Sequence, residues 1–210
     1  MNQDLQQKWN RLILKFSKDE NLNQQLWTEI ESHYSKDNRA YHNLNHLRCI
    51  FQEMDHHQSD IQNPDLLQFS IWYHDIIYNA MRKDNELKSA EKAKEVLTQL
   101  GLEQSDIKQC YQQIMLTKTH QLTEEHSLDE KFLIDFDLEV LSRDWEDYKV
   151  YTQQVRKEYW MYPKLLYNKG RKAALKSFLD REQIYYTNPY REKEQKAIGN
   201  IKQEMEDLLG

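Results

Sequence analysis

Residues 64–78 read PDLLQFSIWYHDIIY, and this stretch decides the fold. Asn63 followed by Pro64 is a typical helix start, because Asn caps free amides and Pro fits the first turn. We predict a helix over residues 64–78 and place it at the centre of the fold, since apolar residues surround its end. His74 and Asp75 lie within the apolar run. An unpaired buried carboxylate costs several kcal/mol. Asp75 therefore needs either a bound cation or a hydrogen-bonding partner. In a buried His–Asp pair without a metal, the histidine would be that partner.

Helical apolar spacing recurs on both sides of this stretch, and no alternating strand pattern exceeds four residues. Asp84 and Ser105 are expected helix caps, and Gly101 is expected to end a helix as its C′ residue. The predicted helices cover 9–16, 22–34, 41–54, 64–78, 84–100, 105–114, 128–141, 145–162, 163–179 and 189–209. The sequence therefore predicts an all-α fold: one compact bundle of about 8–10 helices, spanning residues 1–210 as a single domain.

The composition excludes several classes of protein. The 210 residues include 29 Lys or Arg and 35 Asp or Glu, a formal net charge of −6, which disfavours general nucleic-acid binding. With Gly 4 and Pro 3, the chain lacks the turn residues of sandwiches and Gly-loop nucleotide folds. Two cysteines cannot form a disulfide framework. No signal peptide or long apolar run is visible, so we expect a cytoplasmic protein with no membrane association.

Histidines and aspartates in apolar surroundings are the candidates for chemistry. His42 and His46 are four residues apart and share one helical face, although Asn43 replaces the general base that a zincin would need. Asp135 and Asp137 are flanked by Phe and Leu, so each must cap, pair or bind a metal. Such His and carboxylate sets suit a divalent ion. No Walker, Rossmann or α/β-hydrolase motif occurs, and the two Glu-x-x-His motifs of a ferritin-like site are not both present.

The ordered residues resemble a known superfamily. His46, then His74-Asp75, then an Asp in an Asp-x-Asp-Leu context is similar to the H…HD…D signature of the HD superfamily of metal-dependent phosphohydrolases. The segments YHNLNHL, YHDIIY, NELKSA, IDFDL and RKEY resemble one bacterial branch of predicted HD hydrolases that has no settled substrate. The resemblance covers about residues 39–179, with the helix over 189–209 expected to pack on that core. It implies an HD-domain-like helical bundle.

The resemblance also implies a metal site. His46, His74, Asp75 and Asp137 would be the ligands, and Asp137 fits the signature better than Asp135, which would instead orient a ligand. His42 and His120 are further candidates, should a second metal bind. The sequence does not distinguish Mn, Mg, Zn, Ni, Co or Fe as the divalent ion.

A phosphate substrate also needs positive charge. Lys118, Arg156 and Arg171 are the candidate substrate-binding residues, since Arg suits bidentate phosphate contact, and Lys118 is a catalytic candidate too. Each could equally be a solvated surface charge. Glu86 is a candidate general acid or base, with a helix-dipole role as its alternative. Asp75 is the third catalytic candidate, beside Lys118 and Glu86.

We therefore expect a metal-dependent hydrolase of a nucleotide or another small phosphorylated metabolite, acting through metal-activated water. The partner is the small substrate, and a homodimer is kept as a candidate assembly. The first alternative is a non-catalytic helical binding or regulatory module with a vestigial metal site. The second is a di-iron HD oxygenase.

Overall fold

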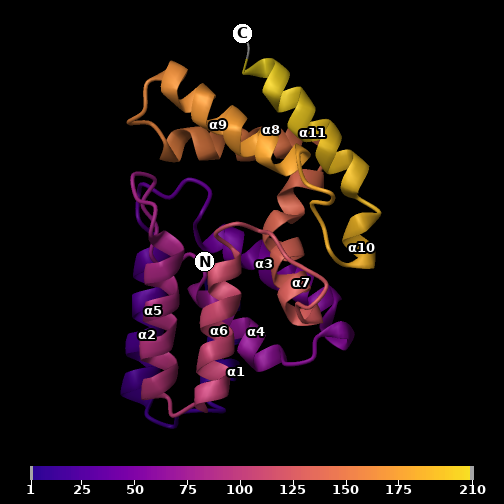
Figure 1. Cartoon of the computed structure of the whole chain (residues 1–210). Coiled ribbons are helices and arrows are strands. Elements are labelled where there is room, and N and C mark those ends of the chain that lie inside the picture. Colours follow the sequence, from indigo (N-terminus) through magenta and orange to yellow (C-terminus); the bar gives the residue numbers. More distant parts are fainter. Residues whose placement is uncertain (1, 209–210) are drawn as a thin grey trace. The chain divides into compact units, whose positions relative to one another are not determined.

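A computed structural model describes residues 2–208, and within them the chain forms eleven α-helices, two 3₁₀ helices and no strand, so the all-α prediction is confirmed (Figure 1). The chain divides into two compact units, residues 1–125 and 126–210. The first holds α1 (Gln3–Ile13), α2 (Glu20–Tyr34), α3 (Leu44–His56), η1 (Gln58–Asp60), α4 (Pro64–Tyr73), α5 (Asn85–Gln99) and α6 (Gln104–Leu116). The second holds α7 (Leu128–Leu138), η2 (Glu139–Ser142), α8 (Trp145–Glu158), α9 (Lys164–Leu179), α10 (Asn188–Arg191) and α11 (Glu194–Asp207).

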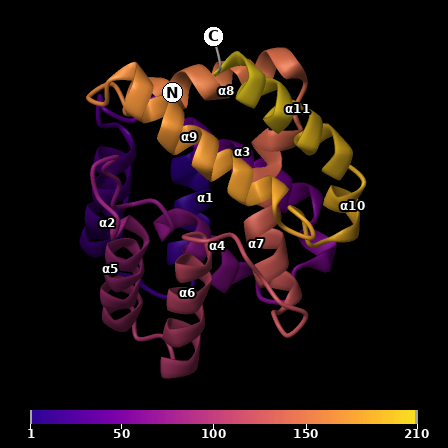
Figure 2. The same ribbon diagram turned by 45° about the horizontal axis from the view of Figure 1, so that its top comes forward.

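Helix α4 is the centre of the first unit, as its apolar sequence predicts. Phe69, Trp72 and Tyr73 are each 0% exposed. Trp72 meets Trp9 of α1 and Trp27 of α2 edge to face, with ring centroids 5.7 and 6.1 Å apart. Helices α5 and α6 lie side by side in both views and pack against α4 (Figure 2). Large aromatic side chains therefore fill this core and fix α4 within it.

Several helix boundaries follow from local sequence. The Asn63 side chain accepts from the Leu66 amide with Pro at the first helical position, and Gly101 has a φ of +76° directly after α5. Ser105 is not the cap that was predicted, because α6 begins one residue before it, at Gln104. Asp84 holds the N-cap position, but its carboxylate binds Arg82 instead of the helix amides.

Several predicted helices are wrong in extent: α1 begins at Gln3, α3 at Leu44, and α8 ends at Glu158 instead of Tyr162. The terminal helix is divided into α10 and α11 by residues 192 and 193, and its predicted last residue, Leu209, lies outside the described residues. The central helix ends at Tyr73 instead of Tyr78, so His74 and Asp75 lie at its carboxyl end. Contacts from distant segments replace the helical hydrogen bonds there, as detailed below.

The second unit has its own buried core. Helix α11 packs against η2, α8 and α9, and Tyr148, Tyr185 and Tyr190 are 0% exposed. A buried polar network joins three of these helices: Glu204 accepts from the Tyr148 hydroxyl at 2.5 Å and from Arg171 Nε at 2.7 Å. Within residues 2–208, no helix is both long and apolar enough to cross a membrane.

Candidate metal centre

Three side chains of the first unit converge on one point. His46 Nε2 lies 3.2 Å from His74 Nε2, and His74 Nε2 lies 3.3 Å from Asp75 Oδ2. The distance from His46 Nε2 to Asp75 Oδ2 is 4.0 Å. Metal–ligand bonds of about 2.1 Å place neighbouring ligand atoms about 3.0 Å apart in octahedral and about 3.4 Å in tetrahedral geometry. Two of the three distances match this spacing and the third, 4.0 Å, is longer, so the three residues form a group that could hold a metal.

His74 is oriented by the end of its own helix. Its Nδ1 lies 2.8 Å from the Ile71 carbonyl oxygen. Because a carbonyl can only accept, Nδ1 carries a proton and donates it, and Nε2 is the ring nitrogen that faces His46 and Asp75. A backbone partner on the second ring nitrogen is a usual feature of metal-binding histidines. The side chain is 1% exposed, so its orientation is fixed.

The helical hydrogen bonds end directly after this residue, whose own backbone is still helical. In a continuing helix the Ile71 carbonyl would accept from the Asp75 amide, but here it faces His74 Nδ1 and the Asp75 amide donates to the Tyr34 hydroxyl at 3.3 Å. That hydroxyl donates in turn to the Trp72 carbonyl at 3.1 Å. Tyr34 therefore provides partners for two backbone groups that α4 no longer pairs.

Arg39 holds this turn against the start of α3 and is a residue that sequence reasoning missed. Its Nη1 donates to the carbonyls of His42 at 3.0 Å and Asp75 at 2.7 Å, and its Nη2 donates to that of Ile76 at 2.8 Å. The guanidinium lies over the Tyr34 ring at 4.8 Å, and the residue is 4% exposed. The sequence places Arg39 in a polar loop. Its position directly before the Tyr41–Leu47 motif is the one signal of a role.

The loop after Asp75 is attached to α5 by two polar side chains. Asn85 exchanges two hydrogen bonds with the backbone of Asn79, at 3.1 and 3.0 Å. Ser89 Oγ lies within hydrogen-bonding distance of both the amide and the carbonyl of Ile77, at 3.1 and 3.3 Å. These contacts give Asn85 and Ser89 of the NELKSA segment a structural function, which is to fix the path of the chain leaving the His-Asp pair.

His42 borders the group of three ligands. Its Nε2 is 4.0 Å from Asp75 Oδ2, and its ring stacks on Tyr78 with centroids 4.2 Å apart. The His42 side chain is 23% exposed and that of Asp75 is 15% exposed, whereas His46 is almost fully buried. The group is therefore partly exposed to solvent on the side of Asp75 and His42. His42 is not among the three residues whose ligand atoms converge, and its role as an additional ligand stays a prediction.

The remaining candidates of the first unit lie near helix ends. Glu86 is half-buried in the first turn of α5, where the helix dipole favours a carboxylate. Lys118 is exposed just past the end of α6, and His120 follows it with a φ of 52°. Their roles in proton transfer, phosphate binding and metal binding stay predictions.

The two aspartates of α7 belong to the second unit. Asp135 is 0% exposed and accepts three hydrogen bonds, from the Tyr186 amide at 2.8 Å and from the Thr187 amide and hydroxyl, both at 2.7 Å. Burial raises the pKa of Asp135 to about 7 despite these donors. Asp135 thus anchors the segment before α10. Asp137 is half-buried on the same helix, and its role as the fourth ligand stays a prediction.

The two candidate phosphate-binding arginines already have protein partners. Arg156 donates to the carbonyls of Tyr159 at 2.6 Å and Tyr162 at 3.0 Å, beyond the end of α8. Arg171 makes a bidentate pair with Glu204, and its guanidinium side chain is 11% exposed. Both side chains therefore have structural functions in the second unit, and binding of phosphate by either stays a prediction.

Comparisons with protein-family models, curated proteins and solved structures find no match to this chain. The donor set itself is informative: two imidazole nitrogens and one carboxylate oxygen suit borderline and hard divalent ions such as Zn, Mn, Fe, Co or Ni. Three protein ligands also leave coordination positions for water and substrate, which is typical of catalytic sites. The residues present therefore fit the divalent ion that the resemblance implies.

Proposed function

We propose that this protein is a metal-dependent phosphohydrolase of a nucleotide or another small phosphorylated metabolite. The observation that carries the proposal is the convergence of His46, His74 and Asp75, with ligand atoms within 4.8 Å of one another. His46 and His74 come from different helices, 28 residues apart, and both are almost fully buried. The resemblance to the HD superfamily supplies Asp137 as the fourth ligand and hydrolysis as the reaction class.

The chemistry that a divalent ion supplies at such a site is a bound water with a pKa lowered towards about 7 and a polarised phosphate oxygen. The protein's own groups hold this chemistry in place. His74 keeps its proton on Nδ1 and presents Nε2, while Arg39 and Tyr34 fix the backbone of Asp75. His42 lies on the accessible side, where its Nε2 can exchange a proton with a bound water or substrate.

Two further groups complete the proposed reaction. Glu86 would act as general acid or base, and Lys118 would stabilise the negative charge that grows on the phosphate. Both are solvent-accessible residues of the first unit, so neither would have to lose a buried partner to bind a substrate. Arg156 and Arg171 are kept as substrate-binding candidates at lower priority, because each would have to exchange its present contacts for a phosphate.

The test compares two carboxylates that flank α4. Asp75→Ala should remove bound metal and phosphohydrolase activity together, whereas Asp65→Ala, at the start of the same helix and paired with Lys15, should change neither. The protein is purified without chelator, analysed for metals, and assayed against phosphorylated metabolites and nucleotides with several divalent ions. Circular dichroism must show the same helical signal in both variants.

Each metal result has a distinct meaning. A single redox-inactive or manganese-like ion with activity supports hydrolysis, and two irons would instead favour oxygen chemistry. Absence of any bound metal in the wild type would support a non-catalytic binding module. Full metal occupancy in Asp75→Ala would contradict the ligand assignment.

A further inference from the structure

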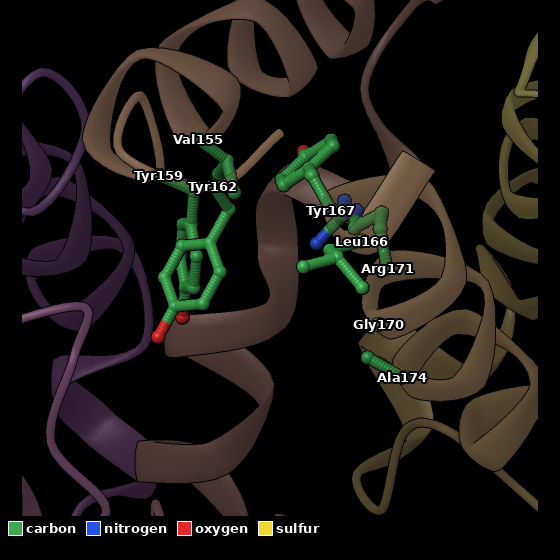
Figure 3. A pocket seen from close by; sticks show the side chains of 8 residues that line it. All are labelled: Val155, Tyr159, Tyr162, Leu166, Tyr167, Gly170, Arg171 and Ala174. Atoms are coloured by element: carbon green, nitrogen blue, oxygen red, sulfur yellow. The ribbon is translucent and has the colours of Figure 1, made fainter. Parts of the chain in front are cut away.

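The second unit contains a cavity of about 310 Å³ between α8 and α9. Figure 3 shows Tyr159 and Tyr162 on one side of it, with Leu166, Tyr167 and Arg171 opposite. The Tyr159 ring centroid lies 5.8 Å from that of Tyr162 and 5.9 Å from that of Tyr167. A volume of this size lies at the low end of the range of small-molecule pockets, which are usually lined by apolar and aromatic side chains.

A glycine within α9 keeps part of this cavity open. Gly170 lines the cavity in the interior of the helix, where glycine lowers helix stability relative to alanine. A Cβ atom added at Gly170 would meet nothing within 4 Å, so protein packing does not require a glycine there. Ala174, one turn further along, also lines the cavity and is small. A ligand that approaches the helix backbone closely would account for both residues.

Arg171 supplies a fixed polar edge to the cavity. Its Nε and Nη2 bind Glu204, and its Nη1 donates to the Tyr151 hydroxyl at 3.3 Å. These contacts use three of the five guanidinium N–H groups, so donors remain for a ligand oxygen. Because Glu204 and Tyr151 hold the guanidinium in place, a ligand would bind it without the entropic cost of ordering a long side chain.

Helix α9, on one side of the cavity, is basic within an acidic protein. It carries five Lys or Arg residues and no Asp or Glu, whereas α8 carries three of each charge and the whole chain has a net charge of −6. The turn that joins the two helices and the start of α9 also expose apolar side chains: Trp160 is 69% exposed and Leu165 is 81% exposed. Positive charge beside exposed apolar surface favours a ligand that is both apolar and negatively charged.

We propose that this cavity binds a small planar aromatic molecule that carries an acidic group. The aromatic ring packs against the exposed faces and edges of these tyrosine rings, over Gly170, since aromatic pairs prefer offset and edge-to-face contacts. The acidic group lies at the Arg171 edge, where a guanidinium matches a carboxylate or sulfonate. This proposal rests on residues of the second unit alone and does not depend on the metal centre.

The test uses anilinonaphthalene sulfonate, a planar aromatic anion whose fluorescence rises on apolar binding. We expect the wild-type protein to bind it with 1:1 stoichiometry and micromolar affinity. Gly170→Phe should weaken binding at least tenfold, because the new ring occupies the cavity. Gly199→Phe is the matched control: Gly199 is also an exposed helical glycine with nothing within 4 Å of its Cβ position, and this variant should bind as the wild type does.

Each part of the proposal can fail separately. Binding that is absent from the wild type, or equal in Gly170→Phe and Gly199→Phe, would overturn the site. The neutral analogue N-phenyl-1-naphthylamine should bind several-fold more weakly than the sulfonate, and equal affinity would overturn the acidic group. Thermal unfolding by circular dichroism shows whether both variants are folded, and Gly170→Ala gives a milder filling of the cavity if Gly170→Phe is not.

Discussion

Replacing Arg39 by Met should destabilise the first unit strongly. The substitution keeps an unbranched apolar side chain but removes the guanidinium donors to the carbonyls of His42, Asp75 and Ile76. A buried carbonyl left without a donor costs about 1–3 kcal/mol. Because local relaxation and water can replace part of the lost bonding, we expect the free energy of unfolding to fall by about 3–6 kcal/mol. That is a large part of the total for a typical domain.

Two further variants separate charge and position from simple loss of an arginine. Arg39→Lys keeps the charge, but a single ammonium cannot reach three carbonyls as a planar guanidinium does, so its cost should be intermediate. Arg48→Met removes an arginine whose ion pair with Asp4 is solvent-exposed, and such pairs contribute about 0–1 kcal/mol. From the most to the least stable, the variants should therefore rank Arg48→Met, Arg39→Lys and Arg39→Met.

Urea denaturation measures these differences. Tryptophan fluorescence suits the first unit, because Trp9, Trp27 and Trp72 are packed in its core. Circular dichroism at 222 nm follows both units, and agreement of the two signals tests whether unfolding is two-state. A loss of less than about 1 kcal/mol in Arg39→Met, or a loss equal to that of Arg48→Met, would refute the claim that Arg39 holds the turn.

Three other substitutions test separate sites. Glu86→Gln should leave metal content unchanged and lower kcat by about 10²–10⁴ if Glu86 transfers a proton, whereas unchanged turnover would limit it to a dipole-stabilising role. Burial raises the pKa of the Cys110 thiol from 9.0 to about 12, so iodoacetamide at pH 8 should label Cys49 and spare Cys110 until the protein is unfolded. The native state favours the neutral thiol, so the stability that this preference contributes should be lost as the pH rises from about 9 to about 12. Cys110→Ala should not show this loss of stability with pH. Glu204→Gln leaves the Arg171 guanidinium buried without its counter-ion, and urea unfolding should show a loss of about 3–5 kcal/mol; a loss below about 1 kcal/mol would contradict the role given to this pair.

The sequence predicted those features that depend on neighbouring residues. Asn63-Pro64 specifies the start of α4 within one turn, and Gly101 ends α5 through a backbone conformation that glycine tolerates. The central position of α4 follows from the apolar side chains that project from every side of the helix. Such signals are local, so they need no knowledge of the tertiary structure.

Features created by distant residues could not be predicted in this way. The early end of α4 depends on Arg39 and Tyr34, which lie more than thirty residues away in sequence. Likewise, the arginine proposed for phosphate binding, Arg171, pairs with Glu204 at a separation of 33 residues. The convergence of His46 and His74 was expected only through the resemblance to a family signature, since neither spacing nor composition reports contacts between helices.

The end of α4 at Tyr73 explains how adjacent residues can serve one metal site. Consecutive residues in a helix project about 100° apart, so a helix continuing to Tyr78 would turn His74 and Asp75 towards different neighbours. Instead, the Ile71 carbonyl faces His74 Nδ1, and the Asp75 amide finds the Tyr34 hydroxyl. The Ile71 carbonyl thus holds the proton of His74 on Nδ1, and the Asp75 carboxylate lies 3.3 Å from His74 Nε2. Substitutions that weaken this turn should therefore lower metal affinity at the proposed site even when both proposed ligands are unchanged.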